Sequence, residues 1–99
     1  MRFLMKIQLP VEEGNKAISD GTLPSLIEST LTKLKPEAAY FFPENGERTM
    51  MMVFDLKDVS EIPVIVEPFF MGVNAKVDLI PVMNAEELRA GLKKASESF

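Results

Sequence analysis

The segment from Ala38 to Leu56 constrains the fold more than any other part of this chain. It reads AAYFFPENGERTMMMVFDL, two strands around a turn, because Asn45-Gly46 readily adopts the positive backbone angles of a hairpin. In the second strand both faces are largely apolar. We therefore expect two covers, the helices of this chain and a second copy of the chain: Met50 and Met52 should meet one of them, and Met51 and Val53 the other.

The order of the predicted elements points to one fold class. Alternating apolar residues predict two further strands, at 2–9 and 75–82. Apolar stripes predict helices at 12–20, 23–34, from about 60, and after residue 84. This is the split βαβ arrangement, so we expect a ferredoxin-like α+β fold, βαββαβ, with an extra C-terminal helix. One domain over residues 1–99 should hold a four-stranded antiparallel sheet with the first and third strands central.

Prolines and a capping pattern place the ends of several elements. Pro81 within the fourth strand predicts an edge strand, because proline donates no ladder hydrogen bond. Pro68 predicts that the helix beginning near residue 60 bends or ends near Glu67. Asn84, with Glu87 three residues later, predicts the start of the last helix.

The chain lacks two residue types on which much enzyme chemistry depends. It has no cysteine, which excludes disulfides, thiolate nucleophiles and zinc–thiolate sites. It has no histidine, which excludes a Ser-His-Asp triad and histidine-ligated haem, zinc or iron. We expect no cofactor and no metal.

Charge and hydropathy narrow the possible partners. The net charge of −4 argues against nucleic acid and gives no attraction to anionic lipid. No apolar run approaches the roughly 20 residues that span a bilayer. Met1–Lys6 does not read as a secretory signal, because Lys6 interrupts its apolar residues. We therefore expect a cytoplasmic protein with no nucleic-acid or membrane partner.

Several short motifs along most of the chain resemble a set of small bacterial proteins in the dimeric α/β-barrel group of ferredoxin-like domains. They are residues 37–41, 48–49, 54–58, 62–63, 67–70 and 81–83. The resemblance implies a homodimer whose two sheets face each other across a twofold axis, with helices outside and a cavity between sheet and helices. It does not fix an activity, since the group includes monooxygenases, isomerases, haem enzymes and ligand-binding regulatory domains. The members that rely on histidine are excluded here.

Three residues are candidates for proton transfer, and each has a structural alternative. Glu67 could act as a general base in an apolar pocket formed by Phe69 and Phe70, or those aromatic side chains could belong to the core. Tyr40, the only tyrosine, could orient or protonate a ligand at the sheet, or it could simply lie half-buried on its strand. Asp55 could transfer a proton or cap the turn after its strand.

A second group of residues could bind a ligand. Arg48 lies just after the hairpin turn and could bind an anion, or it could be a solvated strand end. It lies seven residues from Asp55, so the two should point to opposite faces of the sheet. If the first and fourth strands are neighbours, Lys6 should lie opposite Asp78, and four polar residues could form a patch or an ion pair at the dimer rim: Lys6, Gln8, Lys76 and Asp78.

Three functional hypotheses remain open. The first is a non-catalytic homodimer that binds a small, partly apolar molecule, with candidate ligand-binding residues Lys6, Gln8, Tyr40, Arg48, Phe69, Phe70, Lys76 and Asp78. The second is a cofactor-independent isomerase or monooxygenase acting on an aromatic or quinone-like substrate through Glu67, Tyr40 or Asp55. The third is a structural oligomerisation module. We favour the first, because no pair of titratable groups is placed with acid–base geometry by the sequence.

Overall fold

Four strands form one antiparallel sheet in the computed structural model, which describes residues 1–99. Their order is β2-β3-β1-β4, so the first and third strands are central and the fourth is at an edge, as predicted. Pro81 is the last residue of that edge strand. The strands are β1 (Arg2–Gln8), β2 (Ala38–Glu44), β3 (Glu47–Asp55) and β4 (Lys76–Pro81).

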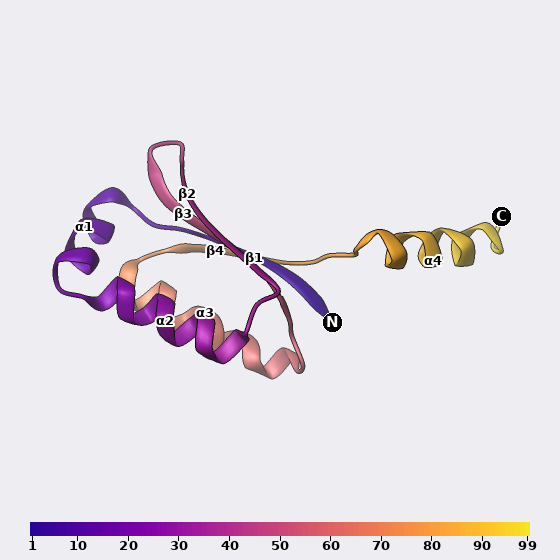
Figure 1. Ribbon diagram of the computed structural model, residues 1–99, viewed down its shortest axis with the longest axis horizontal. Coiled ribbons are helices and arrows are strands. Elements are labelled where there is room, and N and C mark those ends of the chain that lie inside the picture. The colour runs from indigo at the N-terminus through magenta and orange to yellow at the C-terminus, as the bar shows by residue number, and fades with distance from the viewer.

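Three helices cover one face of this sheet, and the fourth stands apart (Figure 1). Gly21, with φ of 80°, separates the first two at the predicted break. A short 3₁₀ turn, η1 (Val59–Glu61), leads into the third helix, and the Asp58 side chain caps that turn by accepting a hydrogen bond from the Ser60 amide. The helices are α1 (Val11–Ser19), α2 (Thr22–Leu34), α3 (Ile62–Val73) and α4 (Ala85–Ser96). The expected α+β, ferredoxin-like arrangement with an added C-terminal helix is confirmed.

The core lies between the helices and alternate residues of the two central strands. Met50 and Met52 of β3 are buried on this side, beside Met5 and Ile7 of β1. Phe69 of α3 is completely buried against them. Since both central strands present apolar side chains at every second position, the sheet and the helices share one continuous core.

Pro68 was predicted either to bend the third helix or to end it near Glu67, and the second of these outcomes is wrong. Helix α3 continues through Pro68 to Val73. Pro68 lies on the exposed side of α3, where water can solvate the carbonyl group that lacks an amide partner. Phe69 and Val73 are buried on the opposite side, so their packing holds the helix together past the proline.

The opposite face of the sheet, which we call the open face, has no cover within the chain. Strand pairing aligns four apolar residues across it, one from each strand: Ala38, Val53, Leu4 and Ile80. Tyr40 and Met51 lie in the adjoining row, and we call these six residues the apolar band. Tyr40 is 67% exposed and Ile80 49%, so the predicted second apolar face is present and uncovered.

Helix α4 is capped and anchored at its N-terminal end but buries none of its side chains against the rest of the chain. Asn84 and Glu87 form the predicted capping box, with two hydrogen bonds of 2.8 Å. The Arg2 guanidinium pairs with the Glu87 carboxylate and fixes the first turn of α4 beside the start of β1. The Asn84 backbone amide and the Arg2 charge lower the pKa of Glu87. No residue of α4 is buried.

The shape of the chain reflects this detached helix. Its extents are 55 × 28 × 19 Å, and its radius of gyration of 16.0 Å exceeds the roughly 13 Å of a compact chain of 100 residues. Figure 1 shows α4 beyond the end of the sheet, away from the other helices.

Two neighbouring phenylalanines test the continuation of α3 past Pro68. Phe69→Ala should lower the free energy of unfolding by about 3–5 kcal/mol, because it leaves a cavity in the core. Phe70→Ala, on the exposed side, should change it by less than about 1 kcal/mol. Urea denaturation followed by circular dichroism measures both. Equal losses for the two variants would contradict the helix orientation described here.

Candidate functional site

Arg48 lies on the helix-covered face of the sheet, at the start of β3, and reaches across to α1. Its Nη1 donates to the Val11 carbonyl at 3.4 Å, and its Nη2 donates to Asn15 Oδ1 at 3.1 Å. Gly14 makes this approach possible, since a Cβ atom there would lie only 2.6 Å from Arg48 Nη1. The strand position and one glycine in α1 therefore hold the guanidinium in place.

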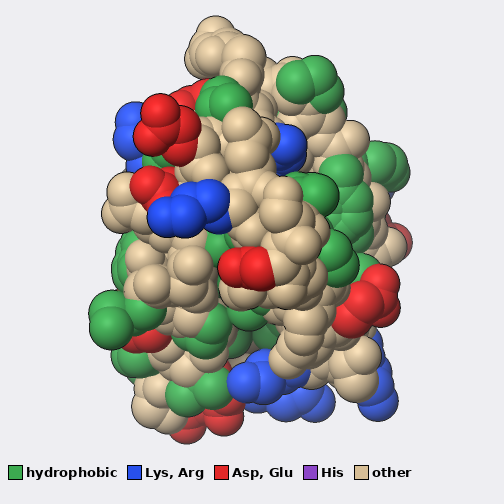
Figure 2. Space-filling model, turned by 90° about the vertical axis from the view of Figure 1, so that its left-hand side faces the viewer, with side chains coloured by type: hydrophobic (Ala, Val, Ile, Leu, Met, Phe, Trp, Pro, Cys, Tyr) green, Lys and Arg blue, Asp and Glu red, His purple; other side chains and the backbone are tan.

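A groove of about 370 Å³ lies beside Arg48, between the β2–β3 hairpin and helices α1 and α2. Phe41 and Ile18, each about half exposed, contribute to it from the hairpin and from α1. Its lining is mainly apolar: Leu9, Ile18, Leu23, Ile27, Phe41, Phe42, Pro43, Arg48, Thr49 and Met50. Figure 2 views the molecule from this end and shows hydrophobic side chains at the surface between charged ones.

The groove combines an apolar lining with one cation. Arg48 uses two of its five N–H donors on α1, which leaves others for an incoming group. A guanidinium can bind a carboxylate through two parallel hydrogen bonds. The arrangement therefore suits a molecule with an apolar body and an acidic end.

The polar residues of β1 and β4 that were predicted to bind a ligand lie together on the open face. The register places Lys6 opposite Asp78 and Gln8 opposite Lys76. Lys6 forms its ion pair with Glu44 of β2, across the sheet from Asp78. Gln8 Nε2 donates to the Glu44 carbonyl at 2.9 Å.

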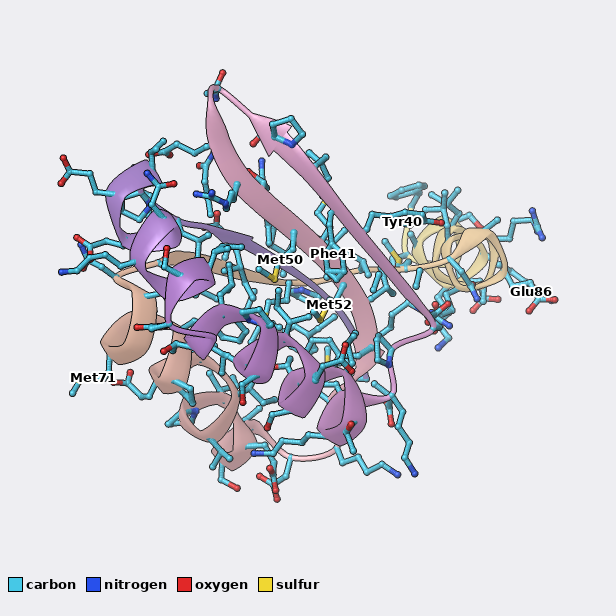
Figure 3. The ribbon with its side chains drawn as sticks, turned by 60° about the vertical axis from the view of Figure 1, so that its left-hand side comes forward. Tyr40, Phe41, Met50, Met52, Met71 and Glu86 are labelled. Atoms are coloured by element: carbon cyan, nitrogen blue, oxygen red, sulfur yellow. The ribbon has the colours of Figure 1, made fainter.

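Tyr40 shares this face but not the groove. It lies in the same row as Lys6, with Met51 between them. Figure 3 shows it on the opposite side of the β2–β3 hairpin from Phe41. Tyr40 therefore belongs to the surface that lacks a cover, and it cannot contact a molecule held beside Arg48.

The three candidates for proton transfer do not come together. Glu67 is exposed on α3, while Phe69 points into the core and Phe70 toward solvent, so the pocket expected around Glu67 does not form. Asp55 ends β3 on the open face, pointing away from the side that holds Arg48, as expected. The Met1 amino group lies 2.6 Å from its carboxylate and lowers the pKa of Asp55. A lowered pKa favours the ionised carboxylate, which is a weak proton acceptor.

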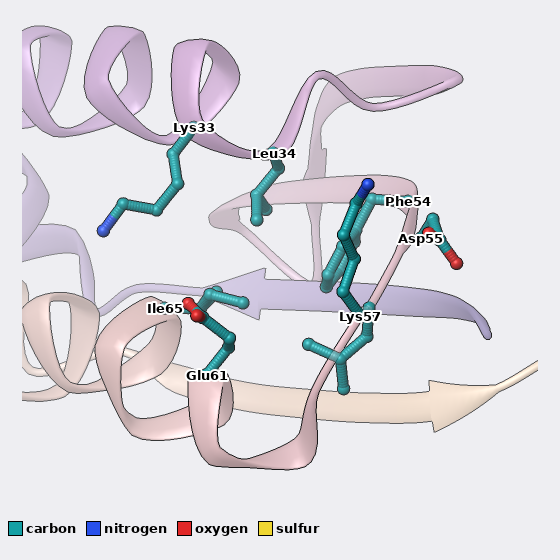
Figure 4. Close-up of a pocket in the computed structure, with 8 residues that line it drawn as sticks. Lys33, Leu34, Phe54, Asp55, Lys57, Glu61 and Ile65 are labelled. Carbon is teal, nitrogen blue, oxygen red and sulfur yellow. The ribbon is translucent and has the colours of Figure 1, made fainter.

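A second hollow, of about 230 Å³, lies at the C-terminal ends of α2 and β3 (Figure 4). Lys33, Lys57 and Glu61 surround apolar side chains of the core there. Charges of both signs are exposed around it, and such charges are mostly solvated. No sequence pattern marked this hollow, because its residues come from four separate elements and a loop.

The structure contains no group of three or more acidic, histidine or cysteine side chains arranged to hold a metal ion. None of its helices combines the length and the apolar character needed to cross a membrane.

Comparison with known proteins identifies a fold and no family. No protein-family model and no curated protein sequence matches the chain. The crystal structure of a formyltetrahydrofolate deformylase from Pseudomonas putida KT2440 is similar, with a TM-score of 0.56 and 9% sequence identity. The similarity covers 83% of this chain and 29% of that enzyme. At this identity the comparison supports the fold alone, and the activity of the enzyme does not transfer.

Gly14 provides a direct test of how Arg48 is held. Gly14→Ala should displace the flexible end of Arg48 and break its hydrogen bonds to α1. The free energy of unfolding should change by no more than about 1 kcal/mol, because the helix propensity of alanine offsets the lost contacts. The guanidinium N–H signals of Arg48 in NMR spectra measure the displacement.

Gly91→Ala in α4 is the matched control, because an added Cβ there meets no atom within 4 Å. Its Arg48 signals should equal those of the unaltered protein. Unchanged Arg48 signals in Gly14→Ala would refute the role assigned to Gly14.

Proposed function

We propose that this protein is a homodimer that binds a small, partly apolar, anionic molecule in the groove beside Arg48. The observation that carries the proposal is the pairing of an apolar groove of about 370 Å³ with a guanidinium held by α1. A volume of this size is at the lower end of the range for small-molecule sites. Aromatic carboxylic acids fit both properties.

Binding is favoured over catalysis because the groove contains no titratable partner for Arg48. Its other lining residues are apolar except Thr49, whose hydroxyl donates to the Glu47 carbonyl. Glu67, Tyr40 and Asp55 all lie elsewhere. A general acid or base has to reach the reacting atom, and none of these residues lines this groove.

The open face supports the homodimer. Its apolar band extends across all four strands and is uncovered in a single chain. Exposed apolar patches of this kind mark interaction sites. A second copy of the chain is the proposed cover, and it leaves the groove on the other side of the sheet accessible.

A thermal-shift screen with aromatic carboxylic acids tests the ligand proposal. A bound acid at 100 times its dissociation constant should add about 2.7 kcal/mol to the free energy of unfolding. Isothermal titration calorimetry then gives the affinity. Arg48→Gln should weaken binding about tenfold, through loss of the charged hydrogen bonds.

Arg89→Gln is the matched control, since it makes the same change on exposed α4. It should bind with unaltered affinity. Neutral analogues of the best acid should bind the unaltered protein and Arg48→Gln equally. If no acid binds, or if Arg48→Gln binds as well as the unaltered protein, the ligand proposal is wrong.

Light scattering in solution tests the homodimer. At micromolar concentration the mass should be twice the 11.1 kDa of one chain. Met51→Lys, in the apolar band, should shift the protein to monomers, because the charge would be buried at the interface. Val64→Lys, on the outer side of α3, should leave the dimer intact. A monomeric unaltered protein would refute this part of the proposal.

A further inference from the structure

Helix α4 carries an apolar stripe that nothing in its own chain covers. The stripe consists of residues spaced alternately by three and four positions, which places them on one side of a helix and its extension: Ala85, Leu88, Leu92, Ala95 and Phe99. All five are exposed, with Leu88 at 45% and Leu92 at 59%. The opposite side carries charged residues such as Glu86, which points outward in Figure 3.

A helix in this position needs a partner to be stable. An isolated helix of 12 residues is marginal in water, and tertiary packing on an apolar side supplies most helix stability. The capping box and the Arg2–Glu87 ion pair fix where α4 begins and in which direction it leaves β4. They bury no apolar surface, so they do not replace packing.

The apolar band on the open face is the matching uncovered surface. A 12-residue helix is about 18 Å long, and three strand spacings span about 14 Å, so one α4 can cross the four strands. Asp78 lies beside the band on β4 and has no ion pair within the chain. The C-terminal half of α4 is basic, with Lys93 and Lys94 in its last turn, and so complements that carboxylate.

We propose that α4 is an exchanged arm, and that α4 of each copy packs its apolar stripe on the apolar band of a second copy. The proposal rests on the homodimer proposed above and names the element that covers the open face. Within one chain α4 leaves the sheet at its end and points away from the band (Figure 1). In a pair of chains each uncovered stripe meets an uncovered band, and the charged side of α4 faces water.

Cysteine cross-linking tests the contact directly, because the chain has no cysteine of its own. Leu88→Cys and Met51→Cys protomers, mixed, unfolded and refolded together, should form a disulfide between the two chains upon mild oxidation. Mass spectrometry should identify two peptides joined through positions 88 and 51 in a product of twice the chain mass. Glu86→Cys with Met51→Cys, on the charged side of α4, should cross-link at least about tenfold less.

A pair of double variants tests the energetic role of the stripe. Leu88→Gln with Leu92→Gln preserves helix propensity and should raise the dissociation constant of the dimer by at least about 100-fold. Glu86→Gln with Ala90→Gln introduces the same residue at the same spacing on the opposite side of α4, where both positions are exposed, and should change the constant less than about fivefold. Analytical ultracentrifugation measures both.

The outcomes separate this inference from the proposed homodimer. A stable dimer that neither cross-links between positions 88 and 51 nor responds to the leucine substitutions would refute the exchanged arm and leave the homodimer standing. A monomeric unaltered protein would refute both. The double variant Leu88→Cys with Met51→Cys provides the remaining comparison, since a disulfide within one chain would place α4 on its own sheet and refute the exchange.

Discussion

The burial of one face of the two central strands is the interaction on which the rest of the structure depends. Met5, Met52 and Phe69 are excluded from water where β1, β3 and α3 meet. Each such side chain contributes about 1.5–3 kcal/mol relative to an exposed one. This packing is strong enough to hold α3 helical through Pro68, where the loss of one backbone hydrogen bond would otherwise favour a break.

The alternation of strand side chains that forms the core also leaves two exposed apolar surfaces, the open face and the groove beside Arg48. Because successive strand residues point to opposite faces, burying Met50 and Met52 turns Met51 and Val53 toward the open face. The β2–β3 hairpin lies partly outside the helical cover, so Phe41 remains half exposed and helps line the groove beside Arg48. Assembly and ligand binding are thus proposed for opposite faces of one sheet, and neither has to interrupt the core.

The sequence predicted the fold more completely than the candidate site. The edge position of Pro81 and the capping box of Asn84 and Glu87 follow from local patterns, and the strand order follows from the order of the elements along the chain. All three are present. Arg48 was recognised as a possible anion-binding residue, but its neighbours were not. Ile18 and Phe41 carry no local signal, because only the angle between α1 and the hairpin brings them to the same groove.

The order of residues along the chain was enough to divide each strand's residues between the two faces of the sheet. Successive side chains point to opposite faces, so burying one residue of a strand fixes the face of all the others. The sequence was also enough to exclude histidine and cysteine chemistry. Only the packing of separate elements showed that Gly14 leaves room for Arg48 to reach α1, and that Glu67 is exposed while Phe69 is buried. It also showed that α4 does not cover the sheet of its own chain. These outcomes depend on how the elements approach one another in space, and the distances between them are not encoded in any local pattern.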